Sequence, residues 1–196
     1  AGTEIAHGVI EHSIDQGLVL VGWTDHGVGS ADDMMLIKTN SVGVMLWTKT
    51  YGVVGQDFAR SVVEHSIDKG FALVGQALSI RAGEFMLVKT DSVGAKLWSK
   101  TLGFGGTEYP FSVIEHSIDN GFVIAGRTDS VGSGSDNDFV IIKTDTVGVE
   151  LWTKTFGGVG DDLAKDMIEH SIDQGLVIAG YTGSYGAGSN DMMLVV

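Results

Sequence analysis

Cysteine is absent from this 196-residue chain, and proline occurs once. Without cysteine there is no disulfide framework, no thiolate zinc site and no thiol nucleophile. Positive charge is also scarce, because 12 basic against 25 acidic side chains leave a formal net charge of −13. That balance argues against a nucleic-acid partner or an anionic membrane, since both need a basic face. No apolar run approaches the ~18 residues of a membrane-spanning helix, so membrane insertion is not expected.

Glycine, by contrast, is abundant, with 29 residues in 196. This is roughly twice the average usage. Because apolar residues make up 43% of the chain, the composition is not that of a disordered protein. It predicts many tight turns between short strands.

Internal repetition is the dominant pattern in the chain. The segment Glu-His-Ser-Ile-Asp occurs four times, with spacings of 53, 51 and 54 residues, starting at Glu11, Glu64, Glu115 and Glu169. A Leu-Trp-x-Lys-Thr segment recurs three times, at Leu46, Leu97 and Leu151. We therefore interpret residues 1–196 as one repeat domain, with approximate repeats 1–53, 54–104, 105–158 and 159–196.

Each repeat is predicted to contain four short strands. In the third repeat they are residues 111–116, 122–126, 139–144 and 150–156, rich in Val, Ile, Phe, Trp and Thr. A turn of Asp119 to Gly121 joins the first two, and there Gly121 is expected to supply a positive φ. A longer loop joins the second and third strands, and a second tight turn joins the third and fourth.

The size of the unit favours a β-propeller, in which four-stranded blades bury each other's faces. We predict an all-β fold, a four-bladed β-propeller of four-stranded repeats of about 52 residues. A linear β-solenoid stack is the alternative.

Three segments strengthen this interpretation: residues 121–128 (GFVIAGRT), 138–145 (DFVIIKTD) and 151–158 (LWTKTFGG). They resemble a β-propeller-type repeat of about 50 residues, found in large secreted and cell-surface proteins, of the form GGYxxAGxT…DxxxVKxDxxGxxxWxKTYGG. The resemblance implies an extracellular or cell-surface setting and an adhesive or structural role without catalytic residues. The chain departs from the pattern at the His-Ser-Ile-Asp turns and at residues 76–81.

The fourth repeat is expected to lack its fourth strand, which leaves 15 strands in total. An open strand edge is a template for another chain. The chain is interpreted as a fragment of a longer repeat protein, as a trimmed chain, or as a subunit whose neighbour supplies the missing strand.

The repeated His-Ser-Ile-Asp segment contains the residue types of a hydrolase triad. Adjacent strand residues point to opposite faces, so His12 and Ser13 are not expected to face each other. We predict a turn in which the Asp organises the bend, with no catalytic residue. The four equivalent histidines invite a metal-binding interpretation, but bonding within each repeat is expected instead, with no metal site: His12, His65, His116 and His170.

Two sets of carboxylates recur at one end of the repeats, and they are the candidate ligand-binding residues. The first set is Glu4, Asp57, Glu108 and Asp162, and the second is Asp33, Glu84, Asp138 and Asp191. Strand alternation predicts two acidic rings at one end, where Ca²⁺ is a possible ligand although no cofactor is expected. The alternative is that these carboxylates cap backbone amides.

One aromatic residue stands outside the repeat. Trp23 occurs in a single repeat, at the predicted loop after the second strand, and is the candidate for contact with a sugar or a partner. The expected function is a non-catalytic extracellular module for protein or glycan interaction or for structural scaffolding. The alternative is a subunit of a surface fibre that self-associates by strand complementation at the open edge of the last repeat.

Overall fold

The computed structural model describes residues 2–26, 31–78, 83–131 and 136–195. These residues form fifteen β-strands in four antiparallel sheets of four, four, four and three strands. The predicted all-β repeat, with three strands in the last unit, is therefore confirmed. The described part of the chain holds no helix long and apolar enough to span a membrane.

Each repeat forms one sheet, numbered here in chain order. Sheet 1 contains β1 (Glu4–Glu11), β2 (Leu18–Thr24), β3 (Asp33–Thr39) and β4 (Met45–Tyr51). Sheet 2 contains β5 (Asp57–Glu64), β6 (Phe71–Ala77), β7 (Glu84–Thr90) and β8 (Lys96–Leu102). Sheet 3 contains β9 (Glu108–Glu115), β10 (Phe122–Thr128), β11 (Asp138–Thr144) and β12 (Glu150–Phe156). Sheet 4 contains β13 (Asp162–Glu169), β14 (Leu176–Thr182) and β15 (Asp191–Val195).

Within every sheet the strands pair in chain order. Because consecutive strands are antiparallel, the first and third connections of a sheet lie at one end, which we call the turn end. The second connection and the link to the next sheet lie at the opposite end, the loop end. This is the arrangement that strand alternation predicts.

In the first turn of each sheet, the residue with a positive φ is not the glycine that the sequence predicts. The positive φ belongs to the residue before the glycine, with values of 51°, 56°, 55° and 59° at Gln16, Lys69, Asn120 and Gln174. Gly121 does not itself have a positive φ. It is needed because a Cβ at this position would collide with the carbonyl oxygen of Thr144. The predicted role of Gly121 is therefore corrected from backbone conformation to close approach.

Consecutive sheets pack face to face and share three apolar cores. Alternate side chains of one strand enter different cores: Leu73 on β6 faces sheet 1, whereas Ala72 and Val74 face sheet 3. Every residue of β6 and of β11 is consequently buried. A single sheet cannot cover both of its faces, so the neighbouring sheets provide the burial.

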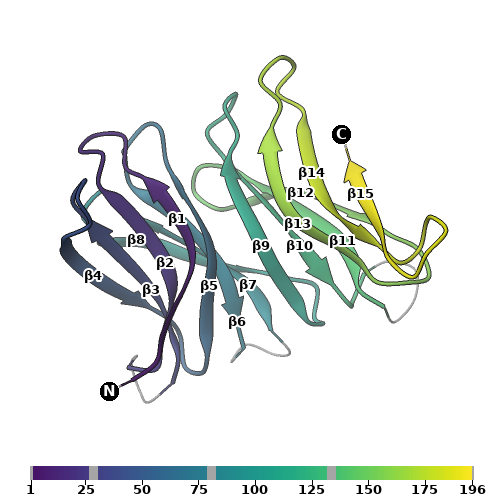
Figure 1. The fold of residues 1–196 in the computed structure, drawn as a ribbon, viewed down its shortest axis with the longest axis horizontal. Helices are drawn as coiled ribbons and strands as arrows, with labels where there is room; N and C mark the ends of the chain where they lie inside the picture. Colours follow the sequence, from purple (N-terminus) through teal and green to yellow (C-terminus); the bar gives the residue numbers. More distant parts are fainter. Residues whose placement is uncertain (1, 27–30, 79–82, 132–135, 196) are drawn as a thin grey trace.

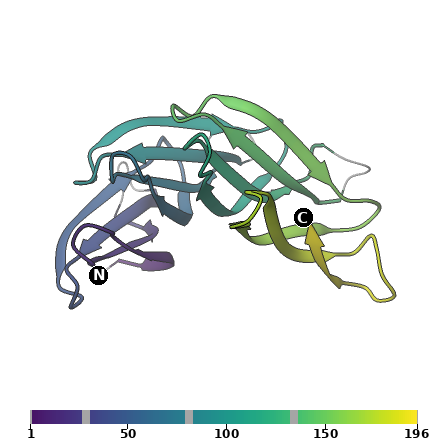
Figure 2. The same ribbon diagram turned by 90° about the horizontal axis from the view of Figure 1, so that it is seen from above.

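The four sheets follow one another along an arch. Their first strands, β1, β5, β9 and β13, are neighbours in succession (Figure 1). The fourth strands, β4, β8 and β12, lie on the outer side of the arch (Figure 2). Figure 2 shows sheets 1 and 4 at the two separated ends of this arch. The closed ring expected of a four-bladed propeller is not seen, because sheet 4 does not return to cover sheet 1.

Candidate functional sites at the loop end and the turn end

The predicted carboxylates of the loop end approach one another in pairs between consecutive sheets. A Cβ added at Gly52 would collide with Asp33 Oδ1 and lie 2.8 Å from Asp57 Oδ2. Asp33 begins β3 of one sheet, and Asp57 begins β5 of the next. We call these pairs carboxylate junctions, and the three are Asp33 with Asp57, Glu84 with Glu108 around Gly103, and Asp138 with Asp162 around Gly157.

Glu4 and Asp191 are the two predicted carboxylates that belong to no junction in the described chain. Glu4 is exposed at the start of β1. Asp191 is half-buried at the start of β15, where its Oδ2 accepts a hydrogen bond from the Gly188 amide at 3.0 Å. The predicted carboxylates therefore lie along the arch as three junctions and two single carboxylates, and not as two closed rings.

The junction carboxylates order the loops that connect the sheets. Asp57 Oδ2 accepts a hydrogen bond from the Val53 amide at 2.8 Å. Asp162 Oδ2 accepts from the Gly158 amide at 3.0 Å and from Ser184 Oγ at 2.6 Å. These contacts match the interpretation of the carboxylates as caps of backbone amides.

Three of the junction carboxylates nevertheless keep one oxygen that no hydrogen bond from the described residues satisfies. Three buried oxygens have no hydrogen-bond partner among the described residues: Asp57 Oδ1, Glu108 Oε2 and Asp162 Oδ1. Burial raises the pKa of Asp57 to about 6, and the neighbouring Asp33 charge adds to the increase. Two adjacent buried carboxylates repel each other unless they share a proton or a cation.

A metal ion needs more ligands than the two carboxylates of a junction supply. In the ranges that the structure describes, no group of three or more His, Asp or Glu side chains is arranged to hold a metal ion. Ca²⁺ takes about six to eight oxygen ligands, and a junction supplies two carboxylates. Burial and the neighbouring Asp33 charge raise the pKa of Asp57, which favours a proton on this carboxylate over a metal ion held by the junction.

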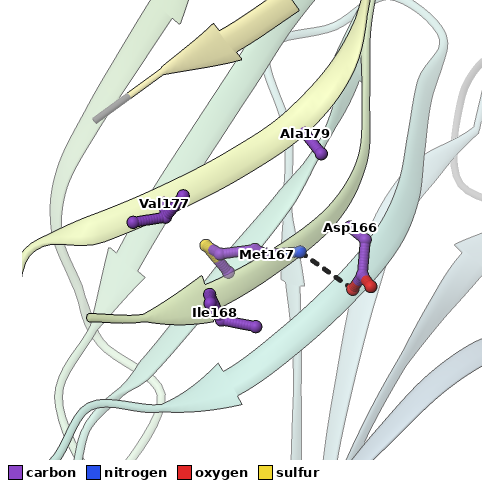
Figure 3. A pocket seen from close by; sticks show the side chains of 5 residues that line it. All are labelled: Asp166, Met167, Ile168, Val177 and Ala179. Atoms are coloured by element: carbon purple, nitrogen blue, oxygen red, sulfur yellow. Dashed lines mark hydrogen bonds between the residues drawn. The ribbon is translucent and has the colours of Figure 1, made fainter. Parts of the chain in front are cut away.

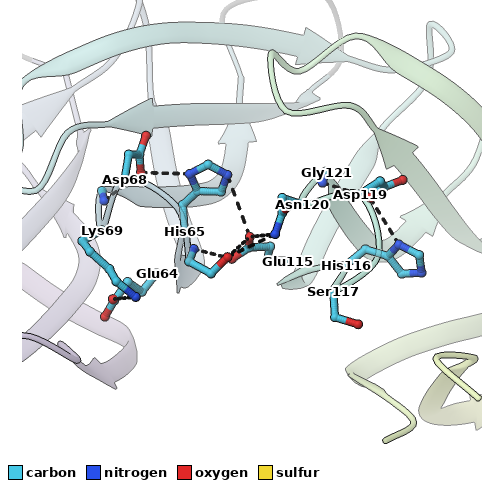
Figure 4. Close-up of polar contacts among 12 residues, drawn as sticks. Glu64, His65, Asp68, Lys69, Glu115, His116, Ser117, Asp119, Asn120 and Gly121 are labelled. Carbon is cyan, nitrogen blue, oxygen red and sulfur yellow. Dashed lines mark hydrogen bonds and ion pairs between the residues drawn. The ribbon is translucent and has the colours of Figure 1, made fainter. Parts of the chain in front are cut away.

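At the turn end, the repeated histidine is held by the aspartate of its own turn (Figure 4). His65 Nδ1 lies 2.9 Å from Asp68 Oδ1, and the buried Lys89 ammonium donates to Asp68 Oδ2 at 2.7 Å. Lys89 Nζ also donates to the Thr90 carbonyl at 2.8 Å. We call this network the His–Asp–Lys turn. The first and third sheets repeat it with His12, Asp15 and Lys38, and with His116, Asp119 and Lys143.

The ion pairs of these turns set the acidity of the aspartates. Burial raises the pKa of Asp68, but hydrogen bonds from Lys89, Gly70 and His65 outweigh it and lower the pKa to about 2. The pKa values of three equivalent aspartates are also lowered: Asp15, Asp119 and Asp173. Each aspartate is therefore ionised near neutral pH, and in the first three sheets its charge compensates that of the buried lysine.

The repeated serine contacts the next sheet instead of the histidine beside it. The Ser66 amide donates to Glu115 Oε2 at 2.6 Å, and Ser66 Oγ donates to Glu115 Oε1 at 2.7 Å. We call this two-point contact the Ser–Glu latch. It recurs between Ser13 and Glu64 and between Ser117 and Glu169. A serine whose hydroxyl donates to a carboxylate is not placed as the nucleophile of the adjacent histidine.

Sequence reasoning did not find the latch, although its signal was present. Both the serine and the glutamate occur in every copy of the Glu-His-Ser-Ile-Asp segment. Strand alternation describes contacts within one sheet, and therefore does not show which residues meet across two sheets.

Trp23 lies on β2, and not in the loop that follows it. Its ring contacts Phe58 of sheet 2 edge to face, with centroids 5.4 Å apart. At the equivalent position of sheet 3, Arg127 lies over the Tyr109 ring at 5.4 Å. The position is half-buried and belongs to the contact between sheets, with part of the indole left accessible.

Together these features define an all-β repeat protein of successive four-stranded sheets, joined by latches at one end and carboxylate junctions at the other. No family model matches this chain, and no curated protein matches it significantly.

Proposed function

We propose that this chain is a non-catalytic module of β-propeller type that works outside the cell or on its surface, as an interaction or scaffolding unit. One observation carries this proposal: the repeated residues that carry chemistry are engaged by the fold. Histidine and aspartate order the first turn of every sheet, and lysine joins them in the first three. Serine and glutamate join the sheets, and the carboxylates hold the loops. A repeat used in this way builds a support for loops.

In this proposal the four sheets are consecutive blades of a propeller larger than four blades. The arch of Figure 2 supports the arrangement, since each sheet covers the next and the first strands share the inner side. The repeat's resemblance to those of large secreted and surface proteins supports the extracellular setting.

The loop end is the proposed contact surface for a protein or a glycan. The loops between the second and third strands differ most among the repeats, and part of the residues 76–81 noted above, 79–81, lies outside the described residues. Trp23 stands close to one of these loops and offers an aromatic face of the kind that sugars contact.

The test is a glycan array and a cell-binding assay with the purified chain. We expect binding that falls at least tenfold in Trp23→Ala, and no change in Leu97→Ala, an exposed residue on the outer strand β8. Surface staining of intact source cells with an antibody to the chain is expected. A purely intracellular signal would contradict the setting, and turnover of a substrate by the chain would contradict the non-catalytic role.

A fibre subunit is the alternative function, and one observation favours it. Beside the open edge of β15 lies a hollow of about 220 Å³ whose lining includes Trp152, Phe156 and Val195. Phe156 is 36% exposed there, whereas the equivalent Tyr51 is 6% exposed. An extended segment of another chain would cover this hollow as a fourth strand.

Electron microscopy distinguishes the two functions. Strand complementation predicts filaments, and it predicts that a synthetic peptide with the sequence of residues 150–156 blocks their growth by occupying the open edge. A scrambled peptide is the control. Discrete particles at every concentration would contradict the fibre function.

A further inference from the structure

Each internal contact between sheets joins two different faces. One sheet contributes alternate residues of its second and third strands, such as Val19, Val21 and Leu36 of sheet 1. The next sheet contributes side chains from its opposite face, such as Val62 of β5 and Leu73 of β6 in sheet 2. We call the first set the forward face of a sheet and the second set its backward face.

Sheet 1 and sheet 4 each leave one of these faces uncovered. Val9 on the backward face of sheet 1 is 59% exposed, whereas the equivalent Val62 is 6% exposed and Met167 is 3% exposed. Met192 and Leu194 on the forward face of sheet 4 are 97% and 67% exposed. The equivalents of Met192 in the other three sheets are fully buried: Met34, Phe85 and Phe139.

Both uncovered faces are apolar and carry the residue types of the internal faces. The forward face of sheet 4 is formed by Ile168, Val177, Ala179, Met192 and Leu194. Figure 3 shows three of these, Ile168, Val177 and Ala179, around a shallow hollow that Asp166 and Met167 also line. The backward face of sheet 1 is formed by Ala6, Val9, Leu18, Leu20 and Ile37.

We propose that the forward face of sheet 4 binds the backward face of sheet 1 in a second copy of this chain. The contact repeats the one that already joins sheets 1 and 2, 2 and 3, and 3 and 4. Its occupant is therefore a sheet with the side chains of sheet 1, and a second copy supplies that sheet.

The polar residues beside the two uncovered faces are also complementary. Ser171 of sheet 4 and Glu11 of sheet 1 are exposed, and neither has a latch partner among the described residues. In the docked pair they form a fourth Ser–Glu latch, since they occupy the positions of Ser117 and Glu169. At the opposite end, the two single carboxylates, Asp191 and Glu4, meet as a fourth carboxylate junction.

A head-to-tail contact satisfies these groups, and a symmetric contact does not. If two sheet 1 faces met, two Glu11 carboxylates would approach each other and neither would find a serine. The contact is therefore heterologous, which closes into a ring or continues as a filament according to the rotation between copies. The four sheets curve in one sense (Figure 2), so continued addition in the same geometry favours a closed ring.

Two charge substitutions test the contact, one on each face. We expect the wild-type chain to associate to a multiple of its 20.7 kDa mass as its concentration rises to about 1 mM. Val9→Glu and Met192→Glu are each expected to remain monomeric, because either change buries a charge in the contact. Mixed in equal amounts, they should form a one-to-one pair through the intact face that each retains.

Val54→Glu is the matched control, because Val54 is 90% exposed and lies in the loop between sheets 1 and 2, on neither face. Analytical ultracentrifugation measures the masses, and circular dichroism confirms that each variant is folded. A monomeric wild-type chain would overturn the proposal and leave the faces to sheets of another protein. Failure of the mixed variants to pair would overturn it as well. The measurement uses the chain alone, so its outcome is independent of the proposed glycan or protein binding.

Discussion

At the scale of single residues, the chain is organised around charges that are buried in fixed partnerships. Lys89 is 2% exposed, and its ammonium group is compensated by Asp68 and by the Thr90 carbonyl. Breaking such a pair costs more than forming it gains, because the remaining charge or carbonyl loses its partner.

Lys89→Met should therefore lower the free energy of unfolding by about 2 kcal/mol, since it removes a charge-assisted hydrogen bond and leaves Asp68 without its cation. Urea denaturation measures the loss. The pKa of Asp68 should rise from about 2 toward the usual range in the variant, which an NMR titration follows. Lys96→Met, on an exposed position of β8, is the control and should change neither quantity.

The carboxylate junctions predict that the free energy of unfolding falls as the pH rises. The folded-state pKa of Asp57, about 6, lies above its value in the unfolded chain, about 3.9. The stability linked to Asp57 is therefore fully present below that lower value and is lost as the pH rises through about 6.

Asp57→Asn keeps an acceptor for the Val53 amide and removes the charge. At pH 8 we expect it to be more stable than the wild type by about 1 kcal/mol, and at pH 4 the difference should vanish. Urea denaturation across this pH range measures both, with Asp136→Asn, an exposed loop residue, as control. A variant less stable than the wild type at pH 8 would show that Asp57 is charged and compensated.

Calcium provides an independent check of the junctions. We expect the same melting temperature in calcium and in EDTA, because two carboxylates fall short of the about six to eight oxygens that the ion takes. Scanning calorimetry of the wild type measures this. A higher melting temperature in calcium, reduced in Asp162→Asn, would show that loop carbonyls complete a site.

At the scale of strands and turns, most of the arrangement followed from spacing and composition. Alternating β-branched and aromatic runs predicted the strands of each sheet, and the placement of both kinds of connection was confirmed. The role of the turn glycines was not predicted correctly, because Gly121 is constrained by a carbonyl oxygen from the neighbouring third strand. A local turn pattern contains no information about that approach.

Neighbouring residues of the first turn should respond oppositely to substitution. Gln16 has a φ of 51°, a conformation that costs a side-chain-bearing residue about 1 kcal/mol. Gln16→Gly should therefore stabilise the chain by about 0.5 kcal/mol, after the added flexibility of the unfolded glycine is subtracted. Gly17→Ala should destabilise it by about 2 kcal/mol, because its Cβ would collide with the Thr39 carbonyl.

Urea denaturation of the two variants measures both effects. Gly43→Ala is a control for the glycine position, since a Cβ there meets no atom within 4 Å and only its positive φ is strained. Equal losses at positions 17 and 43 would contradict the collision as the cause.

At the scale of the whole molecule, the arch depends on contacts between sheets. The sequence predicted that neighbouring sheets cover each other, but the rotation from one sheet to the next depends on how side chains such as Phe71 and Met86 interlock. That packing decides between a closed ring of four sheets and an open arch. The three cores and the three latches then act as successive links in one direction.

Removing one Ser–Glu latch should weaken the contact between the two sheets that it joins. Glu115→Gln places an amide group against the donors of Ser66, so we expect a loss of about 1–2 kcal/mol in the free energy of unfolding. Glu11→Gln is the matched control, since Glu11 is exposed at the end of β1. At concentrations where the chain is monomeric it should have no effect. A similar loss in both variants would contradict the energetic role of the latch.

The buried ammonium groups of Lys38, Lys89 and Lys143 also allow the opening rate of each of the first three sheets to be measured by chemical labelling. An amine-reactive reagent reaches these nitrogens only while the sheet that holds them is open, whereas lysines on the outer strands are labelled at once. Because each lies on a different tryptic peptide, mass spectrometry of the labelled chain would report the opening rate of every sheet separately, in one sample and without any substitution.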